Sequence, residues 1–99
     1  MAYSIHWTRR AYSDLDNIYH FYCKLSTKRV ATSRLNVLKR DIEQLKSMPN
    51  IGQLDEDYCH TPTYRFLVVL NYRVYYFIED MDVFIAAIWD CRQGGTAFE

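Results

Sequence analysis

Two apolar stripes with helical spacing, followed by runs with the character of strands, constrain the fold of this chain most strongly. In both stripes apolar residues recur at intervals of three and four positions: Ala11, Leu15, Ile18 and Tyr22, then Ala31, Leu35, Leu38, Ile42 and Leu45. This spacing places side chains on one face of an α-helix. Thr8 precedes the first stripe and Ser26 or Thr27 precedes the second, and such hydroxyl side chains cap helix N-termini. We therefore predict helices over 8–24 and 27–47, joined by a short connection into an antiparallel hairpin.

Strand patterns stand on both sides of this hairpin. Residues 3–7 alternate apolar and polar side chains, which is the period of a half-buried strand. Pro49 and Asn50 end the second helix, and three runs rich in Val, Ile, Tyr and Phe follow, over 64–70, 72–78 and 83–89. Turn residues at Asn71 and Glu79–Asp82 separate the runs, so they form an antiparallel meander. The sequence predicts one α+β domain over 1–99, with a sheet of about four strands, both helices on one face and a fraying tail over 94–99.

The charge of the chain is balanced overall but divided between its halves. Residues 1–50 carry nine Lys and Arg against four acids, a net +5, whereas residues 51–99 carry three against eight, a net −5. A protein whose whole surface grips a phosphate backbone is expected to be clearly basic. The composition argues against that class of protein.

The sequence predicts no metal, cofactor or disulfide. Its three cysteines are an odd number and show no CxxC or Cys/His ligand spacing, and no glycine-rich loop or paired-carboxylate motif is present. The N-terminus lacks a cationic region followed by a long apolar run, and no stretch has the roughly 18 apolar residues of a membrane span. We expect a cytoplasmic protein with reduced thiols and no membrane partner.

An ordered set of short motifs resembles the RelE/ParE toxin family. The motifs span residues of about 3 to 93: Trp7, Ala11, Asp14-Leu15, Ile18 and Tyr22, then Ile42, Leu45, Pro49 and Gly52, then Tyr64-Arg65, then Tyr72-Arg73-Val74-Tyr75-Tyr76, and a last apolar strand ending near Arg92. The resemblance implies a toxin of a bacterial type II toxin–antitoxin pair, neutralised by a cognate antitoxin. It also implies one of two mechanisms: RelE-like members cut mRNA on the ribosome, whereas ParE-like members poison DNA gyrase by binding it.

Ribosome-dependent mRNA cleavage needs a cation cluster around the scissile phosphate and groups that move protons. The candidates in this chain are Arg65, Arg73, Arg92 and His60. They form a site only if the strand register brings the arginines to one sheet face, which sequence alone does not fix. Arginines on a small antiparallel sheet also commonly pair with acids or lie across a Tyr ring.

The strand half of the chain favours a ParE-like mechanism. It contains no Lys after Lys46 and carries the net negative charge, which opposes docking among ribosomal phosphates. We therefore expect a gyrase poison rather than an enzyme. A RelE-like endoribonuclease is the alternative, and a small non-catalytic module that stacks single-stranded RNA on its aromatic sheet is a second alternative.

Antitoxin binding is expected on the sheet. Helices on one side leave the other face and the edges open to an added strand or helix. Tyr75, Phe77 and Trp89 are candidate anchors if they face away from the helices, and Arg65, Arg73 or Arg92 are candidates to pair with acids of the antitoxin. The sequence is also compatible with a homo-oligomer.

Overall fold

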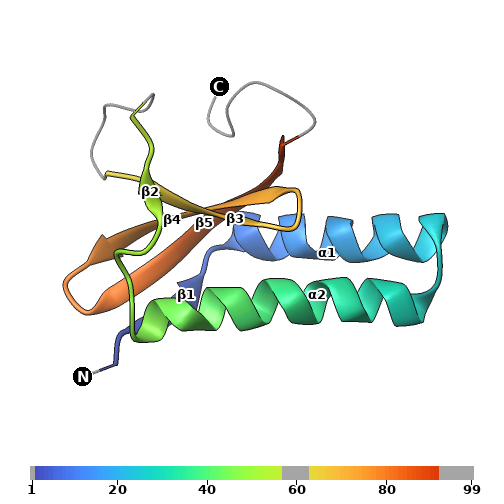
Figure 1. Cartoon of the computed structure of the whole chain (residues 1–99), viewed down its shortest axis with the longest axis horizontal. Helices are drawn as coiled ribbons and strands as arrows, with labels where there is room; N and C mark the ends of the chain where they lie inside the picture. Colours follow the sequence, from blue (N-terminus) through green and yellow to red (C-terminus); the bar gives the residue numbers. More distant parts are fainter. Residues whose placement is uncertain (1, 57–62, 92–99) are drawn as a thin grey trace.

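The computed structural model, which describes residues 2–56 and 63–91, confirms the α+β class (Figure 1). Two helices cover one face of a five-stranded sheet. The elements follow in the order β1 (Ser4–Trp7), α1 (Arg9–Leu25), α2 (Lys28–Glu43), a 3-10 turn (Gln44–Lys46), β2 (Gln53–Leu54), β3 (Arg65–Val69), β4 (Tyr72–Glu79) and β5 (Asp82–Asp90). None of these helices is long and apolar enough to cross a membrane.

Both helices begin where the sequence predicts. The Thr8 hydroxyl accepts a hydrogen bond from the Ala11 N–H, and the Thr27 hydroxyl accepts one from the Val30 N–H, so Thr27 rather than Ser26 is the second cap. The α2 helix ends four residues earlier than predicted, because its last turn tightens into the 3-10 turn. Each helix buries the predicted stripe against the other helix or the sheet.

The strands lie in the order β1-β5-β4-β3-β2. β1 pairs parallel to β5, while the other neighbouring strands pair antiparallel. The helical hairpin between β1 and the meander carries the chain back to the end of the sheet from which β1 starts, which makes a parallel pairing with the last strand feasible. The fifth strand, β2, was not expected, since two residues are too short to show an alternating pattern.

A bulge in β5 decides which side chains face the helices. Tyr75 pairs with Ala87 and Tyr76 pairs with Ile85, which leaves Ala86 as an extra residue in β5. The bulge shifts the alternation by one position, so Ile85 and Ile88 both join the core beneath the helices. Trp89 consequently packs with the residues of the opposite face.

The buried side chains divide into two clusters, one for each sheet face. The larger cluster joins both helices to alternate residues of the meander, among them Val74, Tyr76 and Ile85. The smaller one consists of Phe66, Tyr75, Ala86 and Ala87, with Tyr64, Phe77 and Trp89 packed against it. We call the side that carries the smaller cluster the aromatic face, and its position opposite the helices makes it the candidate functional surface.

Candidate partner-binding surface

A row of rings crosses the aromatic face from one strand to the next. His6 of β1 stacks on Phe84 of β5 with ring centroids 5.0 Å apart, and Phe84 stacks on Phe77 of β4 at 5.1 Å. Tyr64, just before β3, meets Phe77 edge to face at 5.6 Å. The parallel register of β1 places His6 directly beside Phe84. Strand alternation thus assembles four rings, contributed by four separate segments, into one apolar surface.

Arg73 belongs to the same face. It pairs with Val68 and Trp89 in the sheet register, and its guanidinium carbon lies 4.6 Å from the centroid of the Phe66 ring. Its Nη1 donates a long hydrogen bond of 3.5 Å to the Tyr75 hydroxyl, which raises the pKa of Arg73 and keeps the cation fully charged. A guanidinium spread over an aromatic ring presents its edge to a partner's carboxylate.

Arg65 lies on the opposite face from Arg73. It pairs directly with Tyr76, whose side chain is in the cluster beneath the helices, and directly paired residues point to the same side of a sheet. Its Nη1 donates to the carbonyl of Gly52 at 2.9 Å and to that of Asn50 at 3.3 Å. Arg65 therefore holds the connection between α2 and β2, and the register does not bring it together with Arg73.

Tyr76 completes this anchor. Its hydroxyl donates to the Pro49 carbonyl at 2.7 Å and accepts from the Gly52 N–H at 2.9 Å, and the whole side chain is buried. Burial raises the pKa of Tyr76, although the Gly52 hydrogen bond and the Arg65 charge both act to lower it. A Cβ on Gly52 would lie 2.4 Å from the Tyr76 hydroxyl oxygen, so only glycine fits at this position. These residues hold the loop in place and are not part of the aromatic face.

The remaining predicted residues have different placements. Phe77 and Trp89 are partly exposed on the aromatic face, whereas Tyr75 is 1% exposed and supports that face from below. His60 and Arg92 lie outside the described residues. The sequence patterns do not predict the places of His6, Phe84 and Tyr64 in the aromatic row, because these places depend on the cross-strand register.

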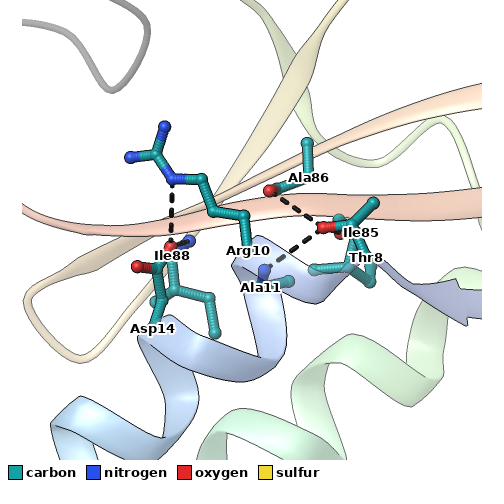
Figure 2. A network of polar contacts seen from close by, with 7 residues as sticks. All are labelled: Thr8, Arg10, Ala11, Asp14, Ile85, Ala86 and Ile88. Atoms are coloured by element: carbon teal, nitrogen blue, oxygen red, sulfur yellow. Dashed lines mark hydrogen bonds and ion pairs between the residues drawn. The ribbon is translucent and has the colours of Figure 1, made fainter.

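A second feature that the sequence did not predict is a set of hydrogen bonds along the edge of β5 beyond the end of β1 (Figure 2). The Thr8 hydroxyl donates to the carbonyls of Ile85 at 2.8 Å and Ala86 at 3.1 Å. The Asp14 carboxylate accepts a hydrogen bond of 3.0 Å from the Ile88 N–H. Side chains from the start of α1 therefore occupy the place of a neighbouring strand. In the sequence, Thr8 followed by Asp14 indicates only a capped helix.

Two observations on the described residues concern metal binding and base stacking. Within residues 2–56 and 63–91 no three His, Cys, Asp or Glu side chains gather to hold a metal ion. In the aromatic row, Phe84 has a ring stacked on each side, so its faces contact neighbouring rings and not solvent. A base would need an open ring face. The surface is better suited to the apolar side chains of a polypeptide.

Comparisons with known proteins agree with this fold and identify the family. The sequence model for the ParE toxin of the type II toxin-antitoxin system, parDE, matches residues 5–94. A solved chain from the chromosomal ParDE TA system from P. aeruginosa is similar with a TM-score of 0.77 and 23% identity, over 90% of this chain and 96% of that one. No curated protein matches significantly. Because the family match spans nearly the whole sequence and confirms the resemblance found in its motifs, this chain belongs to the ParE toxin family of type II toxin–antitoxin systems.

Proposed function

We propose that this toxin acts in the cytoplasm by binding and poisoning DNA gyrase, and that a cognate antitoxin neutralises it by covering the aromatic face. The observation that supports binding over cleavage is the separation of the two arginines. Arg73 lies on the aromatic face, whereas Arg65 lies on the helix side with its guanidinium on two backbone carbonyls. A phosphate-cleaving centre needs cations that converge on one point.

The aromatic face supports the antitoxin half of the proposal. Phe77, Phe84 and Trp89 are each partly exposed; Phe77 and Phe84 stack on each other, and Phe77 and Trp89 both pack against the buried cluster of the aromatic face. Aromatic anchors next to an arginine are typical of the residues that dominate protein–protein binding energy. An antitoxin segment would place apolar side chains over the rings and an acid beside Arg73, and Trp89 would lie at the edge of the contact.

Purified components test the gyrase proposal directly. The full chain, made by cell-free synthesis, is added to gyrase with relaxed plasmid, and supercoiling and double-strand cleavage are followed on gels. We expect loss of supercoiling, and we expect co-synthesised antitoxin to restore it. In parallel, the chain is added to translating ribosomes and the mRNA is mapped for cuts. Ribosome-dependent cuts with unaffected gyrase would overturn the proposal and assign the chain to the RelE-like mechanism.

A matched pair of variants tests the antitoxin surface. Phe77→Ala removes a ring from the centre of the aromatic row, and we expect antitoxin affinity to fall by about tenfold or more, as for a binding hot spot. Tyr12→Ala removes an exposed ring of similar size from α1, where the ring stacks on Trp7. Equal affinities for the two variants in a calorimetric titration would exclude the aromatic face as the antitoxin site.

A further inference from the structure

A pocket of about 290 Å³ lies between α1, the first residue of β4 and the last residues of β5, apart from the aromatic row. Its floor consists of the buried side chains of Ile18, Tyr72 and Ile88. Phe21, which is 46% exposed, and Trp89 form apolar walls. The pocket lies beside the stretch of β5 that extends past β1, where α1 side chains replace a neighbouring strand.

Among the residues that the structure describes, two charged side chains line this pocket, and both are acids. Asp14 reaches it from α1 and Asp90 from the end of β5. The contacts of Asp14 with the Ile88 N–H and with Arg10 Nε, at 3.0 and 3.6 Å, both fall on its Oδ2 atom. A carboxylate has a second oxygen that accepts further hydrogen bonds. The pocket therefore combines flat apolar walls with two carboxylates, one of which already has Arg10 beside it.

We propose that this pocket receives an arginine side chain of a partner polypeptide, with the guanidinium at Asp14 and Asp90 and the aliphatic stem against Phe21 and Trp89. The volume is at the small end of the roughly 300–1,000 Å³ of small-molecule sites, which is enough for one long side chain. Arginine fits better than lysine, because its planar guanidinium stacks on aromatic rings and binds carboxylates through two hydrogen bonds.

This inference rests on the proposed function only in that the chain works by binding other polypeptides. It adds a second contact, of opposite charge to the first. Arg73 on the aromatic face selects an acid of the partner, and the pocket selects a base. A partner that spans both sites would be recognised by the order of its acidic and basic residues. A single hydrophobic contact does not provide this specificity.

Blocked amino acids test the pocket without any natural partner. Acetyl-arginine methylamide is titrated into the ¹⁵N-labelled full chain, and the backbone amides of Ile88 and Asp90 and the indole N–H of Trp89 are followed by NMR. We expect weak, saturable shifts confined to the residues that line the pocket. Acetyl-citrulline methylamide has nearly the same shape without the charge, and we expect it to bind about tenfold more weakly or not at all.

Two variants and a third probe complete the test. Asp90→Asn should lower the preference for arginine over citrulline, because only the Asp14 carboxylate remains, whereas Asp16→Asn, at an exposed position of α1 outside the pocket, should leave the preference unchanged. The dispersion of the same spectra reports whether each variant is folded. Equal binding of both blocked probes, an undiminished preference for arginine in Asp90→Asn, or tighter binding of free arginine would overturn the proposal. A chain that binds the probe but leaves gyrase active would refute the proposed function alone.

Discussion

The two faces of this sheet use similar side chains for different purposes. Beneath the helices, Val74, Tyr76 and Ile85 are fully buried, and the one polar group among them, the Tyr76 hydroxyl, has two backbone partners. On the aromatic face the rings contact one another across strands and are partly exposed. The same alternation of strand residues therefore produces a closed core on one side and an apolar surface on the other.

The two faces separate the contacts that maintain the fold from those that are available for binding. Arg65 and Arg73 occupy similar places in sequence, near the starts of β3 and β4, yet one is held by loop carbonyls and the other lies over a ring. Residues of the helix side should therefore change stability when they are altered. Residues of the aromatic face should change affinity more than stability.

Neighbouring residues of β5 give the largest expected contrast. Ile85→Ala removes a fully buried side chain beneath the helices, and we expect the free energy of unfolding to fall by about 4 kcal/mol. Phe84→Ala removes a partly exposed ring from the aromatic row, and we expect a loss of about 1.5 kcal/mol from the lost stacking and burial. Urea unfolding measures both. Equal losses of stability would show that the aromatic face is a second core.

Gly52→Ala tests how tightly the loop is packed beside the helix-side cluster. The added Cβ would lie 2.4 Å from the Tyr76 hydroxyl oxygen and 2.9 Å from the Phe66 carbonyl oxygen, and the second contact is backbone that moves little. We expect a loss of about 3 kcal/mol, the upper part of the range for overpacking. Combining it with Tyr76→Phe removes the closest contact, so the double variant should cost less than the sum of the single changes. A cost equal to that sum would exclude a clash with the hydroxyl.

Tyr76→Phe alone should cost about 2 kcal/mol, because it leaves the buried Pro49 carbonyl and Gly52 N–H without their partner. It should also change the response to alkali. Burial raises the folded-state pKa of Tyr76 above that of the unfolded chain, so the unfolded state loses its proton first as pH rises. The stabilising contribution is complete below pH about 10 and is lost as the pH rises beyond that value. The free energy of unfolding, measured from pH 8 to 11, should therefore decline less steeply for the variant than for the natural chain.

Local patterns in the sequence predicted most of the fold. The stripe from Ala11 to Tyr22 and the cap at Thr8 fix a helix through interactions within a few residues, and the structure has both. Strands over 64–70, 72–78 and 83–89 were expected within two residues of their observed bounds. The two-residue β2 strand carries no pattern of its own and forms only because β3 is there to pair with it.

The candidate site was less predictable because it depends on register. Nothing in Ile85-Ala86-Ala87-Ile88 marks Ala86 as the extra residue, yet the bulge there turns Trp89 toward the aromatic face. The separation of Arg65 from Arg73 follows from pairing with Tyr76 and Val68 respectively, and one residue of slip would reverse a side chain's face. His6 joined the ring row only through the parallel pairing of β1 with β5.

Asp14 provides the smallest and most local test, at the edge where the two faces meet. Its carboxylate accepts the Ile88 N–H, which would otherwise lie on an unpaired stretch of β5. Asp14→Ala should lower the free energy of unfolding by about 1.5 kcal/mol and speed hydrogen exchange of the Ile88 amide, whereas Asp14→Asn keeps an oxygen acceptor and should cost about half as much. Asp16→Ala, at an exposed neighbouring position, is the control and should stay within about 0.5 kcal/mol. Unchanged exchange at Ile88 in Asp14→Ala would mean that the strand edge is closed by something other than α1, and that the pocket beside it has a different wall.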